Sequence, residues 1–66
     1  MPRKIRELIT DLRRAGFFLD RQAGSHRQFK HERFRGALTV SGAEGGDARP
    51  YQERQVKSAI QKVQGA

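Results

Sequence analysis

The sequence contains no cysteine, only half as many acidic as basic residues, and no long apolar run. Without cysteine the chain can form neither a disulfide nor a thiolate metal site, which is typical of a reducing cytosol. The longest apolar stretch, AGFFL at residues 15–19, is far too short for a membrane span or for the apolar part of a signal peptide. We therefore expect a cytoplasmic protein that does not associate with a membrane.

The small size limits how stable the protein can be by itself. Its 66 residues leave room for one domain, residues 1–66, and a domain of this length buries only about 60% of the surface that its unfolded chain exposes. Because disulfides are excluded, a metal or a partner protein is the other common support for so small a scaffold. A protein partner is therefore a reasonable expectation.

Positive charge is what the sequence has in excess. Fourteen Lys and Arg against seven Asp and Glu give a net charge of +7. Residues 1–40 hold ten of the basic and four of the acidic side chains, so most of the charge lies there. Such an excess favours a polyanionic partner such as nucleic acid, through neutralisation of its phosphates. The alternative is that the charges only keep a small domain soluble.

Apolar periodicity predicts a helix near each end of the chain. The first is expected to end at Gly16, which can take the left-handed conformation, and the second to begin near Pro50, which suits a first helical turn. The apolar stripes are Ile5, Leu8, Ile9 and Leu12 in the first helix, and Val56, Ala59, Ile60 and Val63 in the second.

Three short strands are predicted between the helices, at residues 17–22 (FFLDRQ), 26–31 (HRQFKH) and 37–41 (ALTVS). Their inward-facing apolar side chains are expected to be Phe17 and Leu19, then Phe29, then Leu38 and Val40. The loop that follows, SGAEGGDAR, lacks the lysine and the strand-to-helix context of a P-loop, so we interpret it as a connection and expect no cofactor.

These elements predict an α+β fold with the order α-β-β-β-α. Short loops between the strands make an antiparallel sheet of three strands. Each helix has one apolar stripe and the sheet has one apolar side, so both helices should pack on the same face of the sheet. The opposite face is left to solvent.

The segment AGSHRQFKH, residues 23–31, carries the candidate chemistry. If Phe29 points into the core, alternation places Arg27 and His31 on its side of the strand, and His26, Gln28 and Lys30 on the open side. The two histidines then cannot chelate one metal or act as a local acid/base pair. Any catalysis is expected to be independent of a bound metal, or to use a loosely held ion that leaves no mark in the sequence.

One interpretation of this segment is an RNA-cleaving site. His26 could remove the proton of a ribose 2′-hydroxyl, which would then attack the adjacent phosphorus. Lys30, with Arg27 or Arg33 nearby, could offset the negative charge that develops. Gly24 would let a phosphate approach the backbone, and the hydroxyl of Ser25 could donate to it.

Simpler interpretations stay open at this point. His26 could be a surface histidine at the start of a strand, and His31 a partly buried or edge histidine. Ser25 is a poor candidate nucleophile because no Asp or Glu is at hand to orient His26 in a triad. Phe18 on the open face could stack on a base, cover a neighbouring side chain or belong to a protein interface.

The arrangement resembles the HicA toxin family, also called YcfA-like, of bacterial toxin-antitoxin modules. The resemblance covers about residues 4–63: an amphipathic helix ending in AGF, a strand, then GSHRQFKH, a short strand and a final helix. It implies a fold like the double-stranded RNA-binding domain and activity as an mRNA interferase, an endoribonuclease that cuts transcripts. It also implies that His26, in the GSH segment after Gly24, is the essential catalytic residue, and that a HicB-type antitoxin covers the site.

Three functions are carried forward. The first is a ribonuclease toxin with His26 as catalytic residue and Gly24, Ser25, Arg27 and Lys30 as substrate-binding residues. The second is an RNA-binding module that does not cut, which stays open because the chain has SGAEGGDARPYQERQVKSAIQKVQ where many family members have a proline- and histidine-containing segment. The third is an adaptor whose basic surface docks an acidic protein.

Overall fold

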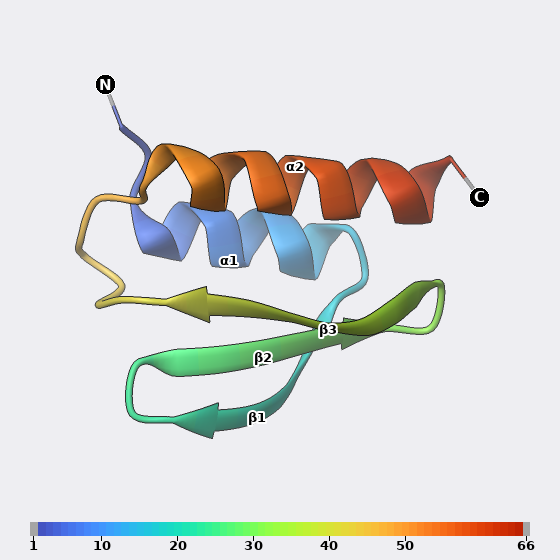
Figure 1. Cartoon of the computed structure of the whole chain (residues 1–66), viewed down its shortest axis with the longest axis horizontal. Helices are drawn as coiled ribbons and strands as arrows, with labels where there is room; N and C mark the ends of the chain where they lie inside the picture. Colours follow the sequence, from blue (N-terminus) through green and yellow to red (C-terminus); the bar gives the residue numbers. More distant parts are fainter. Residues whose placement is uncertain (1, 66) are drawn as a thin grey trace.

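The computed structural model describes residues 2–65. Along the chain it contains helix α1 (Ile5–Arg14), strands β1 (Phe18–Ala23), β2 (His26–His31) and β3 (Phe34–Ser41), and helix α2 (Pro50–Gln64). The strands form one antiparallel sheet in the order β1-β2-β3, and both helices lie on the same side of it (Figure 1). The predicted α-β-β-β-α order and α+β class are confirmed.

Helix α1 ends as its glycine predicts. Gly16 has a φ of 97°, in the left-handed region that favours glycine. Its amide donates to the carbonyl of Arg13 (3.0 Å), and the amide of Phe17 donates to the carbonyl of Leu12 (2.9 Å), which together make a Schellman motif. This ending turns the chain back toward the sheet and brings Phe17, which is buried, into the core.

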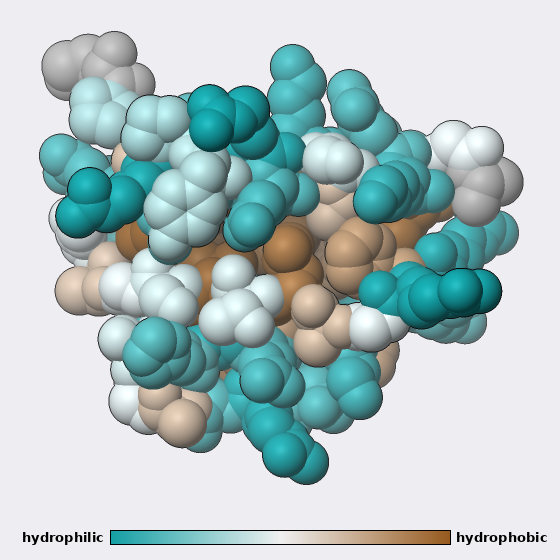
Figure 2. All heavy atoms as spheres, viewed as in Figure 1, coloured by the Kyte–Doolittle hydropathy of each residue, from teal (hydrophilic) through white to brown (hydrophobic). Residues whose placement is uncertain are grey.

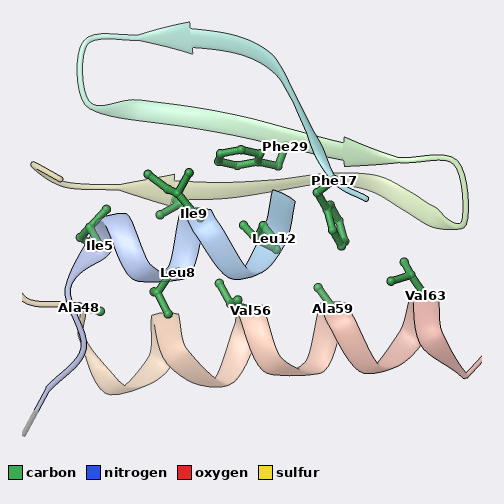
Figure 3. Close-up of a cluster of buried hydrophobic side chains, with 11 residues drawn as sticks. Ile5, Leu8, Ile9, Leu12, Phe17, Phe29, Ala48, Val56, Ala59 and Val63 are labelled. Atoms are coloured by element: carbon green, nitrogen blue, oxygen red, sulfur yellow. The ribbon is translucent and has the colours of Figure 1, made fainter. Parts of the chain in front are cut away.

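The core lies between the sheet and the two helices, as Figure 3 shows. The predicted stripe of α1 is buried throughout, whereas in α2 the stripe is buried except for Ile60, which is partly covered. Figure 2 shows hydrophobic residues mainly in a band between the helices and the sheet, with hydrophilic residues around it. The buried apolar residues are Ile5, Leu8, Ile9, Leu12, Phe17, Phe29, Val40, Ala48, Val56, Ala59 and Val63.

The outer strand β1 departs from its prediction. It begins at Phe18, one residue later than expected, and all six of its residues are exposed. Leu19 pairs with Phe29 and so shares its face, yet it is 39% exposed. The reason is that the helices pack over β3, which is the edge strand opposite β1 (Figure 1).

Strand β3 is longer than predicted. Its first part is irregular, and the sequence pattern did not reveal it. It starts at Phe34 instead of residue 37, and the pairing with β2 shifts between Phe29 and His31. Gly36, in the extra stretch of β3, has a φ of 79°. A bulge of this kind interrupts the alternation of side chains, so the pattern that reveals a strand is lost there.

Candidate active site on the open face of the sheet

Strand β2 divides its side chains between two environments, as predicted. Arg27 and Phe29 point toward the helices and are buried, whereas His26 and Lys30 point away and are exposed. We call the side of the sheet away from the helices the open face. Its residues are His26, Gln28 and Lys30 of β2 with their cross-strand partners Phe18, Arg21, Ala23, Thr39 and Ser41.

His26 has one side-chain partner among residues 2–65. Its cross-strand neighbour is Ser41, the last residue of β3, and the hydroxyl oxygen of Ser41 lies 2.8 Å from Nδ1 of the imidazole. This contact uses the nitrogen nearer the backbone, and within the described residues Nε2 has no hydrogen bond while the side chain is exposed. The ring is therefore oriented by the protein and still accessible to a ligand.

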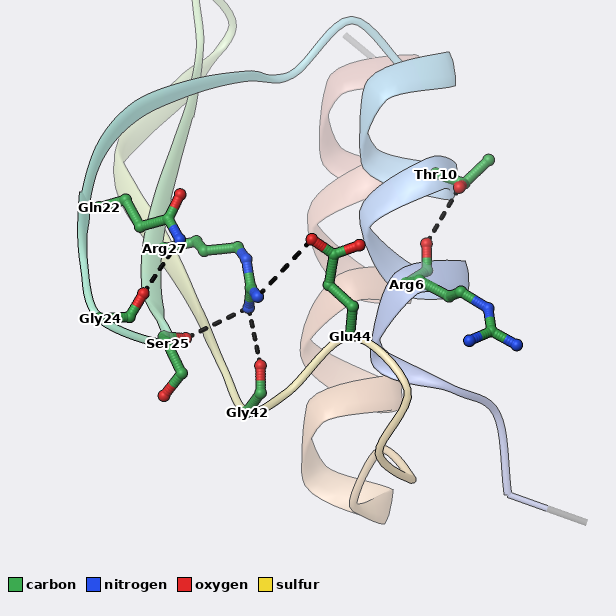
Figure 4. A network of polar contacts seen from close by, with 8 residues as sticks. All are labelled: Arg6, Thr10, Gln22, Gly24, Ser25, Arg27, Gly42 and Glu44. Carbon is green, nitrogen blue, oxygen red and sulfur yellow. Dashed lines mark hydrogen bonds and ion pairs between the residues drawn. The ribbon is translucent and has the colours of Figure 1, made fainter.

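Arg27 lies behind His26, on the side of the sheet that faces the helices. It is only 7% exposed, and its guanidinium donates to the carbonyl of Gly42 (2.8 Å) and to that of Ser25 (3.2 Å). A carboxylate oxygen of Glu44 lies 3.9 Å from the same guanidinium (Figure 4). Its head group is therefore occupied within the protein. Arg27 joins the residue before His26 to the residue after Ser41 instead of sharing the open face with the histidine.

Two further hydrogen bonds close the strand ends around the His26–Ser41 pair. The amide of Gly42 donates to the carbonyl of Ser25 (3.2 Å), and the side chain of Gln52 on α2 donates to the carbonyl of Ser41 (2.9 Å). Gln52 is buried and also accepts from the amide of Arg49 (2.8 Å), so α2 is tied to the same place. The chain at Ser25 is thus tied to Gly42, and the chain at Ser41 is tied to α2.

The turn before His26 is open. Gly24 has a φ of 59°, and a Cβ added there would meet nothing within 4 Å. The side chain of Gln22 donates to the carbonyl of Gly24 (3.0 Å), which braces the turn (Figure 4). Ser25 is exposed beside it. A ligand phosphate could therefore reach the backbone at Gly24 and the hydroxyl of Ser25 without displacing a side chain.

Lys30 is farther from His26 than a single phosphate can bridge comfortably. The two are four residues apart on one strand, a separation of about 13 Å at the usual strand rise. The ammonium of Lys30 lies 3.6 Å from a carboxylate oxygen of Asp20, in a solvent-exposed pair. Lys30 is therefore placed to meet a different part of an extended ligand than the part at His26.

His31 has a structural role. Its Nε2 lies 3.0 Å from the carbonyl of Ala15, and its Nδ1 accepts from the amide of Arg33 (2.9 Å). A carbonyl can only accept and an amide can only donate, so the ring is the neutral Nε2–H form. The ring also contacts Phe17, with centroids 5.0 Å apart. The interpretation of His31 as a partly buried histidine is confirmed, and the sheet separates it from His26.

Sequence reasoning missed Ser41, Gly42 and Gln52. Ser41 ends a strand and becomes a neighbour of His26 only through the β2–β3 register, which the sequence does not display. Gln52 lies in a helix among other polar residues, with no pattern to mark it as buried. Within residues 2–65 no three His, Asp or Glu side chains come together to hold a metal ion, and neither described helix is long and apolar enough to cross a membrane.

Comparison with known families gives one clear result. The family model described as the HicA toxin of bacterial toxin-antitoxin matches residues 5–62, from the start of α1 nearly to the end of α2. Comparisons with curated proteins and with solved structures give no match. The matched range contains His26 and every residue that holds it in place. The chain therefore belongs to the HicA toxin family and is a toxin of a toxin-antitoxin system.

Proposed function

We propose that the protein is an mRNA interferase, an endoribonuclease that stops translation by cutting transcripts. The observation that carries this proposal is the imidazole of His26, exposed on the open face and hydrogen-bonded at Nδ1 to Ser41. In the reaction, Nε2 takes the proton of a ribose 2′-hydroxyl, and the freed oxygen attacks the adjacent phosphorus. The bond from phosphorus to the 5′-oxygen breaks, and that oxygen takes a proton from water, which leaves a 2′,3′-cyclic phosphate and a 5′-hydroxyl end.

The partner of Nδ1 suits this role. A base at Nε2 needs the proton on Nδ1, and a hydroxyl can accept from Nδ1–H in both the neutral ring and the imidazolium that forms. The hydroxyl of Ser41 thus supports the ring before and after proton transfer. Backbone hydrogen bonds at Ser25 and Gly42 keep the two strand ends in register.

The phosphate groups of the substrate are bound around this histidine. Gly24 and Ser25 offer an open turn for the phosphate at the cleavage site, and Lys30 binds one farther along the strand. Arg27 acts indirectly, by holding the carbonyls of Ser25 and Gly42. Residues 1–40 carry most of the net charge of +7, which attracts RNA to this part of the chain.

The partner of the toxin is a HicB-type antitoxin that covers the open face. The family is described as the toxin of a bacterial toxin-antitoxin pair, which implies a cognate antitoxin. An antitoxin that covers His26 would block the enzyme. Because it would bind the folded toxin and not the unfolded chain, it would also stabilise this small domain. Because the substrate is mRNA, the protein acts in the cytoplasm.

One feature favours a second candidate, an RNA-binding module that does not cleave. No carboxylate among residues 2–65 contacts the ring of His26, whereas many catalytic histidines are oriented by one. This candidate predicts binding that weakens with salt and leaves the RNA intact.

The test is expression without antitoxin of the wild type, His26→Gln and the control Gln55→Ala. Gln55 is exposed on α2, on the helix side of the molecule, so its loss should change nothing. Wild type and Gln55→Ala should arrest growth and produce transcripts with new 5′-hydroxyl ends, whereas His26→Gln, folded to the same extent, should do neither. Equal arrest by all three, or arrest without new ends, would refute the nuclease.

A further inference from the structure

An exposed aromatic ring lies on the open face beside a cation. Phe18 is 54% exposed and is the direct cross-strand partner of Lys30. Because paired residues in an antiparallel sheet share a face, the phenyl ring and the ammonium group lie next to each other on the same side as His26. About half of the Phe18 side chain is therefore accessible to a ligand.

The surface next to Phe18 is hollowed by the irregular part of β3. Gly36 has no side chain, and a Cβ built there would meet nothing within 4 Å. A hollow of about 370 Å³ lies at this end of the sheet. It is lined by Phe18, Lys30, His31, Glu32, Phe34 and Gly36. Phe18 therefore has open space beside its ring.

We propose that Phe18 is a stacking platform for a base of single-stranded RNA, and that Lys30 binds the phosphate next to that base. The proposal rests on the proposed function, since it describes how the same substrate lies on the open face. Aromatic side chains bind unpaired bases by stacking on them, and adjacent cations bind the backbone. In a duplex the faces of the bases are already covered, so the site selects single strands.

The distance along β2 separates the nucleotide that stacks on Phe18 from the nucleotide that is cut at His26. His26 and Lys30 are about 13 Å apart at the usual strand rise. A strand that passes His26 along the open face therefore reaches Phe18 with a nearby nucleotide and not with the one that is cut. Arg21, exposed on β1 between these two ends, adds a cation to the path.

Asp20 is the acidic side chain that pairs with Lys30 in this path. Its carboxylate oxygen lies 3.6 Å from the ammonium of Lys30 and 4.0 Å from the guanidinium of Arg21. Exposed pairs of this kind contribute little free energy. A phosphate can therefore displace Asp20 from Lys30, and the carboxylate still has Arg21 as a neighbour.

The test measures RNA binding in a His26→Gln background, so that it does not depend on cleavage. The probes are a fluorescently labelled single-stranded RNA and a blunt duplex of the same sequence. Phe18→Ala is compared with Phe18→Tyr, which keeps the ring, and with Tyr51→Ala. Tyr51 is a matched control because it is an aromatic residue 50% exposed on α2, away from the open face.

Phe18→Ala should weaken single-strand binding by about 5- to 150-fold, as loss of one stacked base does. Phe18→Tyr and Tyr51→Ala should bind like the background, and duplex binding should not change. Equal affinity for Phe18→Ala and the background, an equal loss on both probes, or no RNA binding by the background would overturn the proposal. If the wild type proves unable to cut RNA while Phe18→Ala still loses single-strand binding, the nuclease fails and the stacking site stands.

Discussion

The hydroxyl oxygen of Ser41 lies 2.8 Å from Nδ1 of His26, across the β2–β3 ladder. These two residues are 15 positions apart in sequence: His26 begins β2 and Ser41 ends β3. In the proposed mechanism Ser41 positions the imidazole of His26 and does not itself contact the substrate. This relationship leads to the first prediction.

Ser41→Ala should lower the rate of RNA cleavage about 2- to 10-fold, the usual effect of one neutral hydrogen bond. KM for RNA should stay the same, because the substrate does not contact Ser41. Ser41→Thr keeps the hydroxyl and suits a strand, so it should restore the rate. Single-turnover kinetics separate the two parameters. A change in KM alone, or a threonine variant as slow as the alanine variant, would contradict a positioning role.

Arg27→Met should destabilise the fold by about 1–3 kcal/mol, because the carbonyl of Gly42 loses the donor of its part-buried hydrogen bond. Urea unfolding measures this change. RNA affinity at a protein concentration and temperature where both proteins are folded should fall little. If affinity fell strongly while stability stayed the same, Arg27 would be a direct ligand of the phosphate.

Gly16→Ala and Gly24→Ala should lower the free energy of unfolding by different amounts, although both positions have positive φ. Each loses about 1–2 kcal/mol from placing a side chain in the left-handed region. At Gly16 the new Cβ would also come within 3.0 Å of Nε2 of His31, whereas at Gly24 it would meet nothing within 4 Å. Thermal unfolding should therefore show a larger loss for Gly16→Ala. Equal losses would mean that the His31 contact exerts no restraint.

Phe29→Ala should lower the free energy of unfolding by about 3–5 kcal/mol, since the ring is completely buried. For so small a domain this loss should leave much of the free protein unfolded. Leu19→Ala, at the cross-strand partner that is 39% exposed, should cost about 1 kcal/mol or less. Circular dichroism of the two variants checks the difference. Similar losses would show that β1 is covered more than the structure indicates.

The sequence predicted the parts of the fold that depend on local pattern. The stripe from Ile5 to Leu12, the glycine ending at Gly16 and the bounds of β2 follow from periodicity and from the conformational freedom of glycine. Alternation along β2 likewise separated His26 from His31. These features are set by residues close together in the chain.

The parts that could not be predicted depend on tertiary arrangement. The exposure of Leu19 follows from which strands the helices cover, and the early start of β3 from a bulge at Gly36. Ser41 and Gln52 become neighbours of the site only once register and helix docking are known. The direction of Arg27 was predicted, but its partners at Ser25 and Gly42 were not.

The most direct test of the proposed mechanism uses purified protein and an RNA whose cleavage site has been mapped. The ribose before the cut is replaced by 2′-deoxyribose, and the ends of the products are identified by mass spectrometry. We predict that the wild type converts the all-ribose RNA to 2′,3′-cyclic phosphate and 5′-hydroxyl ends, in the presence of a metal chelator, and leaves the 2′-deoxy RNA intact. Cleavage of the 2′-deoxy RNA at the same position, or undiminished cleavage of the all-ribose RNA by His26→Gln, would contradict the role assigned to His26.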